Sequence, residues 1–270
     1  MNWLEAILLG FVQGATEFLP VSSSGHLLLV PALFRLPEPN LTLISIAHAG
    51  TLLAVLIYFR QDIWHIILGF LRALWQRRPM GTLEARLGWF ILVGSLPAAI
   101  AGITLESFFD AIFGQPTYAA VFLMVTAVLL VLGERAFSGR KGLAEMGWLD
   151  AIIIGLAQMF AILPGISRSG STITAGLARG LDRATAARYS FLLGTPAIAG
   201  AGLLALLDLR HAPDLGNQIP LLLLTFATAA IVGYACIHLL LRWLRQRSLY
   251  GFAAYCAAFS LVYLLVAWLR

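Results

Sequence analysis

Two short stretches of the chain combine charged and polar side chains with proline and glycine. The first, at 13–26, reads QGATEFLPVSSSGH, and the second, at 164–172, reads PGISRSGST. The side chains in them that could take part directly in a reaction are Glu17, Ser23, His26 and Arg168. A serine can act as a nucleophile and an imidazole as a general acid or base, while an arginine fork matches the oxygens of a phosphate. The two stretches therefore predict a site for phosphoryl chemistry.

The residues around Arg168 favour an anion-binding site. Glycines let backbone N–H groups approach an anion, and a helix that starts after the loop, near Thr172, adds its positive end. The predicted substrate-binding residues are Ser22, Ser167, Ser169, Gly170 and Thr172. The spacing of a P-loop is absent. Simpler readings stay open: Glu17 and Arg168 as a structural ion pair, His26 as a helix cap, and single serines as loop formers.

Glu17 predicts a metal ion at the same place. Gln13 lies one helical turn before Glu17, so both side chains face one way. A carboxylate beside a phosphate needs a cation between them, and oxygen ligands suit Mg²⁺ or Ca²⁺. We therefore predict a divalent metal held by Glu17 and Gln13.

The composition shows what surrounds these polar groups. Of 270 residues, 60% are hydrophobic and 11% are charged, whereas soluble domains carry roughly 25% charged residues. The net charge of +5 does not indicate nucleic-acid binding, because the arginines lie mostly in short loops between apolar runs. That pattern is typical of a polytopic membrane protein.

The apolar runs predict an all-α protein with six transmembrane helices. They are 41–59, 87–107, 117–134, 184–207, 219–242 and 249–269. Two further apolar segments, 3–19 and 148–163, run into a proline and then a Ser/Gly-rich stretch, so we expect two re-entrant helical hairpins. Non-helical backbone at membrane depth is tolerated only where protein or a wet cavity surrounds it.

The chain, a single membrane domain over 1–270, contains an internal repeat with halves at 1–137 and 148–270. The two halves share, in the same order, Trp, an acidic residue, Gly, Gln, Pro and Ser-x-Ser-Gly, beginning with WLEAI in the first half and WLDAI in the second. Further along, AAIAG of 98–102 matches AAIVG of 229–233. Each half holds three predicted spans, so the second must be inverted relative to the first. Inverted repeats place their site where the broken helices meet, and the two Ser/Gly stretches should face each other.

Charge distribution predicts the orientation. One set of loops carries most of the arginines and the other set only three, so the positive-inside rule puts the first set in the cytoplasm. Both termini then face outward. The segment 61–80, with two tryptophans among arginines, predicts an interfacial amphipathic stretch.

The two motifs at 13–26 and 164–172 resemble those of the undecaprenyl-diphosphatase family, the bacitracin-resistance phosphatases of bacteria. The resemblance extends over essentially the whole chain. The resemblance implies hydrolysis of undecaprenyl diphosphate to the monophosphate and phosphate, which recycles the lipid carrier for peptidoglycan synthesis. It implies catalytic roles for Glu17, Ser23, His26 and Arg168, and phosphate binding by Ser167 and Thr172. It also implies the bacterial inner membrane and a site open to the periplasmic side. Gln13 stands where some members have Glu, so a second acidic metal ligand is missing.

Several alternatives remain at this level. A lipid transporter or flippase would also use inverted repeats with broken helices. Lipid phosphatases of the acid-phosphatase type share a Ser-Gly-His element, but the position six residues after Arg168, where they have histidine, is Thr174. The attacking group could be Ser23, His26 or water, and the sequence leaves open whether the chain forms a homodimer.

Overall fold

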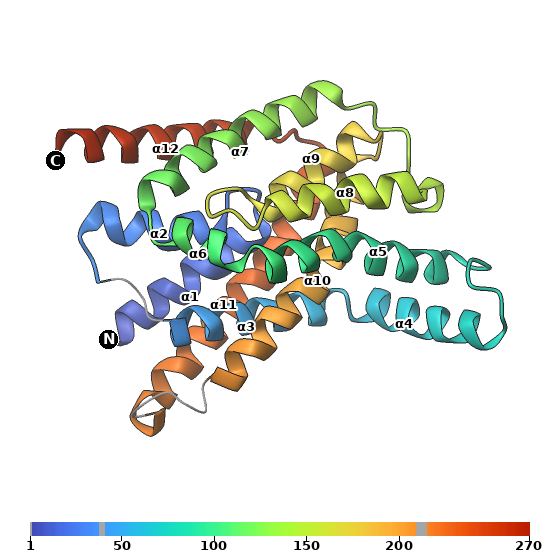
Figure 1. Ribbon diagram of the computed structural model, residues 1–270, viewed down its shortest axis with the longest axis horizontal. Coiled ribbons are helices and arrows are strands. Elements are labelled where there is room, and N and C mark those ends of the chain that lie inside the picture. The colour runs from blue at the N-terminus through green and yellow to red at the C-terminus, as the bar shows by residue number, and fades with distance from the viewer. Residues whose placement is uncertain (1, 38–40, 209–214) are drawn as a thin grey trace.

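The computed structural model describes residues 2–37, 41–208 and 215–270 (Figure 1). Over these ranges the chain is built from helices, joined by short turns and one short 3-10 helix at Leu143–Glu145. The α-helices are α1 (Trp3–Phe18), α2 (Ser23–Phe34), α3 (Leu41–Tyr58), α4 (Arg60–Trp75), α5 (Leu83–Thr104), α6 (Glu106–Phe113), α7 (Pro116–Ala136), α8 (Trp148–Phe160), α9 (Arg168–Ala178), α10 (Arg183–Asp208), α11 (Leu215–Leu244) and α12 (Tyr250–Leu269).

Four helices of the described ranges, α5, α7, α11 and α12, are long and apolar enough to cross a membrane. A fifth candidate is the pair α3 and α4, which is bent by 76° at the break between the two helices. Large apolar side chains on these helices point outward, with Ile103 79% exposed. Outward apolar surface of this extent needs lipid around it. The prediction of a polytopic, helical membrane protein is thereby confirmed.

The two segments that end in proline form helical hairpins, α1–α2 and α8–α9. With 16 residues in α1 and 13 in α8, these helices are roughly 24 and 20 Å long, shorter than the ~30 Å hydrocarbon layer. The sequence predicted that the Ser/Gly stretches would be non-helical. That prediction was wrong for most of each stretch, because α2 begins at Ser23 and α9 at Arg168.

The serine before each of these helices explains the early start. The hydroxyl oxygen of Ser22 accepts a hydrogen bond from the Gly25 N–H at 3.2 Å, and that of Ser167 accepts one from the Gly170 N–H at 3.0 Å. Serine is among the best N-cap residues, since its side chain satisfies a backbone donor that the helix leaves unpaired. Each Ser-x-Ser-Gly motif is therefore a helix start.

The hairpins pack across the molecule. Helix α1 packs mainly on α11 and also on α3, whereas α8 packs on α5 and α9. Helix α7 lies between α12 and α9, and Figure 1 shows α7 and α12 running side by side along one edge. Buried residues from both halves of the sequence, including Phe18, Phe90 and Phe191, form one apolar core. This arrangement brings the starts of α2 and α9 together.

An ion-pair cluster holds the base of the second hairpin. Asp150 in the first turn of α8 accepts hydrogen bonds from Arg179 at 2.8 Å and from Lys141 at 3.3 Å. The Asp150 side chain is only 4% exposed, so its charge needs these partners. The cluster fixes α8 to the end of α9 and thereby sets where the other end of the hairpin lies.

Candidate active site

The loops of the two hairpins contact each other. The Ser169 hydroxyl donates to the Leu19 carbonyl at 3.1 Å. A Cβ atom placed on Gly25 would lie 3.1 Å from the Cα of Gly165, so the two backbones approach closely there. The facing loops predicted from the sequence are thus observed as contacts between 19–25 and 165–170.

Ser23 and Arg168 occupy matching positions, since each is the first residue of its helix. Helix starts carry unpaired N–H groups and a partial positive charge, and they favour anions. Ser22, which caps α2, has a φ of 69°, a strained conformation for a residue with a side chain. The local backbone is therefore constrained at the start of α2, beside Ser23.

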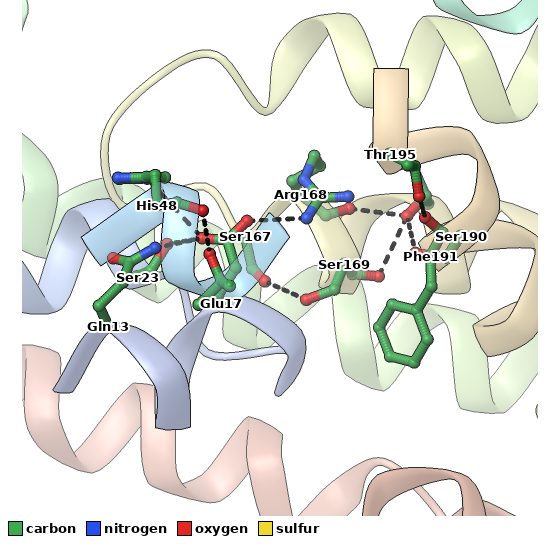
Figure 2. A network of polar contacts seen from close by, with 12 residues as sticks. Gln13, Glu17, Ser23, His48, Ser167, Arg168, Ser169, Ser190, Phe191 and Thr195 are labelled. Atoms are coloured by element: carbon green, nitrogen blue, oxygen red, sulfur yellow. Dashed lines mark hydrogen bonds and ion pairs between the residues drawn. The ribbon is translucent and has the colours of Figure 1, made fainter. Parts of the chain in front are cut away.

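Glu17 is the centre of the polar network (Figure 2). One of its oxygens, Oε1, accepts a hydrogen bond from Arg168 Nη2 at 2.8 Å. The other, Oε2, accepts from the Ser23 hydroxyl at 2.6 Å and from Gln13 Nε2 at 3.0 Å. The side chains of Glu17 and Arg168 are 7% and 16% exposed. A buried carboxylate with three donors is held in its ionised form, and it is placed to accept the proton of Ser23.

Three polar atoms near this network are buried without a hydrogen-bond partner among the described residues. They are Gln13 Oε1, Arg168 Nη1 and Ser171 Oγ. A buried polar atom without a partner costs about 1–3 kcal/mol, and such atoms call for an explanation such as a ligand. They leave an acceptor free beside Glu17, a guanidinium donor free against Gly194 of α10, and the hydroxyl of Ser171 free one turn along α9.

The imidazole nearest to Glu17 is that of His48, in α3. Its Nε2 lies 3.9 Å from Glu17 Oε2. Its Nδ1 lies 2.8 Å from the Ile44 carbonyl, which can only accept, so Nδ1 carries a proton and Nε2 is the ring nitrogen that faces Glu17. Figure 2 shows His48 on the same side of Glu17 as Gln13 and Ser23. The signal in the sequence was a lone histidine inside an apolar span, which often marks function.

His26 lies outside this network. Its Nδ1 donates to the Ser22 carbonyl at 2.8 Å, and its Nε2 accepts from the Tyr255 hydroxyl at 2.7 Å. The ring stacks on Phe259 with centroids 4.8 Å apart, and the residue is 3% exposed. Both ring nitrogens are therefore engaged in holding the start of α2.

The hydroxyls predicted to bind substrate have partners within the protein. Ser22 and Ser167 cap their helices, and Ser167 also pairs with Ser169 at 3.2 Å. Thr172 donates to the Arg168 carbonyl at 2.8 Å and lies 2.6 Å from the Ser190 hydroxyl. These contacts shape the loop around Arg168. Binding of phosphate by these serines, by Thr172 and by the backbone at Gly170 stays a prediction.

Gly194 in α10 creates the space that the Arg168 guanidinium occupies. A Cβ atom at position 194 would lie 1.5 Å from Arg168 Nη1, well inside any contact distance. In the sequence, Gly194-Thr195 stands out only as the counterpart of Gly50-Thr51 in the first half of the repeat. The reason for glycine becomes visible when α9 and α10 are seen packed together.

The donor set near Glu17 suits a hard cation that takes few protein ligands. Among the described residues, no three His, Cys, Asp or Glu side chains form a metal-binding group. Glu17 offers a carboxylate and Gln13 a free amide oxygen on the same face of α1. Mg²⁺ is commonly held by one or two carboxylates together with substrate phosphates. The residues therefore fit a metal that binds with the substrate.

Comparison with known proteins agrees with the two motifs. The family model described as bacitracin resistance protein BacA matches residues 6–262. A protein named undecaprenyl-diphosphatase from Myxococcus xanthus is 45% identical over 98% of this chain and 89% of its own. Proteins of the same name from Thermomicrobium roseum and Methanosphaera stadtmanae are 45% and 41% identical over at least 98% of both chains. This chain belongs to the bacitracin resistance protein BacA family.

Proposed function

We propose that this protein hydrolyses undecaprenyl diphosphate to undecaprenyl phosphate and inorganic phosphate. The reaction recycles the lipid carrier of peptidoglycan synthesis and protects against bacitracin, which sequesters the diphosphate. Family membership supports the activity. The observation that carries the site is the contact of one buried carboxylate, Glu17, with both Ser23 and Arg168.

The geometry favours Ser23 as the attacking group. Its hydroxyl already donates to Glu17 Oε2 at 2.6 Å. As Ser23 Oγ bonds to the terminal phosphorus, its proton passes to Glu17 and the bond to the bridging oxygen breaks, which releases undecaprenyl phosphate. Glu17 first gives the Ser23 proton to solvent. Water then attacks the phosphoserine, Glu17 takes a proton from that water, and this proton passes to Ser23 Oγ as its bond to phosphorus breaks, which releases inorganic phosphate. A phosphoserine detected after rapid quenching would distinguish this route from direct attack by water.

Arg168 and the two helix starts neutralise charge on the transferred phosphoryl group. Arg168 Nη1 and the Ser171 hydroxyl are the free buried donors available for this task. The leaving group is a phosphomonoester with a second pKa near 6, so it departs with little help from an acid. Electrostatic stabilisation should then dominate, and His26 acts by holding Ser22 and the start of α2 in place.

A divalent metal, Mg²⁺ or Ca²⁺, completes the proposed site. It would be held by Glu17, by the free oxygen of Gln13 and by substrate phosphate oxygens, and when bound it supplies positive charge that offsets the diphosphate. Glu17 has a second task in this arrangement, since it also orients Arg168 and Ser23.

The finer architecture that we propose is six transmembrane helices and two re-entrant hairpins, arranged as inverted repeats over 1–137 and 148–270. A glycine contact supports the repeat. A Cβ atom on Gly10 would lie 2.6 Å from the Thr225 carbonyl oxygen, and one on Gly155 would lie 2.4 Å from the Gly94 carbonyl oxygen. Gly10 matches Gly155, and Gly94 matches Thr225, in the alignment of the two halves. The same close approach thus occurs twice, at equivalent positions.

Family membership supports the bacterial inner membrane as the location, and by the positive-inside rule we propose that the arginine-rich loops face the cytoplasm. The termini and the opening of the site then lie on the periplasmic side, where the polyprenyl tail reaches the site from the lipid. A homodimer is compatible with this arrangement, and cross-linking in native membranes would test it.

Lipid transport is the competing function, since inverted repeats with broken helices are common in transporters. It predicts lipid movement across liposomes, whereas a phosphatase releases phosphate in detergent. The site favours the phosphatase, because a carrier has no need of the hydrogen bond between Ser23 and Glu17.

The decisive experiment is phosphate release from a polyprenyl diphosphate by the purified protein in detergent, with Mg²⁺, Ca²⁺ or EDTA. We expect metal-dependent release that is lost in Glu17→Ala and Arg168→Ala. Absence of release by folded protein under every metal condition would overturn the proposal.

A further inference from the structure

A cavity at the far end of the α4–α5 hairpin lies apart from the site around Glu17. Figure 1 shows this hairpin projecting beyond the other helices, at the right of the view. The two helices approach closely, because a Cβ atom on Gly69 would lie 2.6 Å from the Cβ of Glu84. Near this contact is a cavity of about 560 Å³, lined by the second half of α4, the turn and the start of α5. That volume lies within the usual range for small-molecule sites.

The walls of this cavity are cationic on balance. Two guanidinium groups, those of Arg72 and Arg78, face one carboxylate, that of Glu84. Neither arginine belongs to an ion pair found in the described part of the chain. Free arginines at a concave surface favour phosphate, which they bind through two parallel hydrogen bonds.

The turn that carries Arg78 is well ordered. The Arg78 N–H donates to the Ala73 carbonyl at 2.9 Å, and the Gly81 N–H donates to the Arg78 carbonyl at 3.0 Å. Thr82 caps α5 by accepting from the Ala85 N–H at 3.2 Å, which leaves its hydroxyl hydrogen free to donate. The backbone around the cavity is therefore fixed by its own hydrogen bonds before any ligand binds, which lowers the cost of binding.

An apolar face on α4 lies next to the cavity. Trp64, Ile67, Leu71 and Trp75 follow helical spacing along one side of α4 and are exposed by 60%, 47%, 56% and 90%. The residues of α4 that line the cavity, such as His65 and Arg72, occupy the adjoining side. Tryptophans favour the level of the lipid headgroups, and Trp75 ends α4 beside the turn that carries Arg78. The cavity is thereby placed among phosphate groups of the lipids.

We propose that this cavity binds the headgroup of an anionic phospholipid from the leaflet that the arginine-rich end of the protein faces. The phosphate contacts Arg72 and Arg78, with Thr82 as a further donor. Glu84 accepts from a donor of the headgroup. Two arginines against one carboxylate leave the lining with an excess of one positive charge, which favours a lipid of net negative charge such as phosphatidylglycerol over a zwitterionic one. Basic pockets on the cytoplasmic side of membrane helices are known binding places for anionic lipids.

Native mass spectrometry of the detergent-purified protein tests the proposal with phosphatidylglycerol, phosphatidylethanolamine and phosphatidylcholine. The test variant is Arg72→Gln/Arg78→Gln. The matched control is Arg242→Gln/Arg247→Gln, which removes two exposed arginines at the end of α11 and just after it. Both variants lose the same charge, and neither touches the phosphatase site.

We expect wild type and control to retain phosphatidylglycerol in preference to the other lipids, and the test variant to bind it at least tenfold more weakly. Equal losses in both variants would mean general charge attraction and would overturn the proposal, as would a preference for phosphatidylethanolamine. Competition by water-soluble glycerol 1-phosphate at similar concentration would also overturn it, since the site would then serve a soluble ligand. Phosphate release and the thermal midpoint of unfolding are measured for each variant to show that it is folded. Arg72→Gln and Arg78→Gln as single variants repeat the test if the double variant does not fold.

Discussion

Replacing Gly194 by alanine should inactivate the enzyme without unfolding it. The new methyl group would lie 1.5 Å from Arg168 Nη1, whereas non-bonded atoms need about 3.5 Å. The guanidinium must therefore move by roughly 2 Å. Such a shift separates Arg168 from Glu17 Oε1, to which it now donates at 2.8 Å, and moves it away from the phosphoryl group.

The expected loss in kcat/KM is about 100-fold, or ~2.7 kcal/mol, because a misplacement of even 1 Å or the loss of one oxyanion donor costs that much. Stability should change little. The displaced atoms are the end of a flexible side chain that is 16% exposed, and alanine is favoured over glycine within a helix by up to about 1 kcal/mol.

The matched control is Gly200→Ala in the same helix, where a Cβ atom would meet no other atom within 4 Å. Both variants should show thermal midpoints within a few degrees of wild type, and only Gly194→Ala should lose phosphate release. Wild-type activity in Gly194→Ala would refute the reasoning. A fall in activity that follows a large fall in the thermal midpoint would refute the claim that the effect is local.

Gly155→Ala should destabilise the protein by about 1–3 kcal/mol, since its Cβ would lie 2.4 Å from the backbone oxygen of Gly94. The control is thermal unfolding of Gly102→Ala in α5, whose Cβ meets nothing within 4 Å. His26→Asn should keep a substantial fraction of activity, with a loss of about tenfold or less, because its amide can still donate to the Ser22 carbonyl; a loss of 100-fold or more would instead indicate that His26 transfers a proton. Excess EDTA should abolish phosphate release and Mg²⁺ or Ca²⁺ should restore it, whereas activity in EDTA would remove the metal from the site.

The sequence predicted the convergence of Glu17, Ser23 and Arg168 for a physical reason. Charged groups at membrane depth persist when they pair, and a lone acid in the stretch 13–26 and a lone arginine in the stretch 164–172 leave few partners. In the structure, the Ser23 hydroxyl lies 2.6 Å from Glu17 Oε2 and Arg168 Nη2 lies 2.8 Å from Glu17 Oε1. The long apolar runs likewise predicted the helices, because only helices satisfy the backbone in lipid.

Other features depend on packing that a single sequence does not display. The sequence predicted a role for His26 in the reaction, which stays a prediction, but it did not show that the ring contacts Tyr255 and Phe259 of α12, more than two hundred residues away. His48 faces Glu17 because α3 packs beside α1. The helix starts at Ser23 and Arg168 were misjudged because capping by Ser22 and Ser167 outweighed the low helix propensity of Ser and Gly.

Each hairpin packs against a helix from the other half of the chain, and this limits how the molecule can move. Helix α1 is locked against α11 through Gly10, and α8 against α5 through Gly155. Each half of the chain therefore holds a helix of the other half. Neither half can rotate as a separate rigid body without opening both glycine contacts. Opening them would expose close-packed backbone to lipid. A substrate must then reach Glu17 through movement of loops and side chains, which suits an enzyme with a fixed site better than a carrier that alternates between two sides.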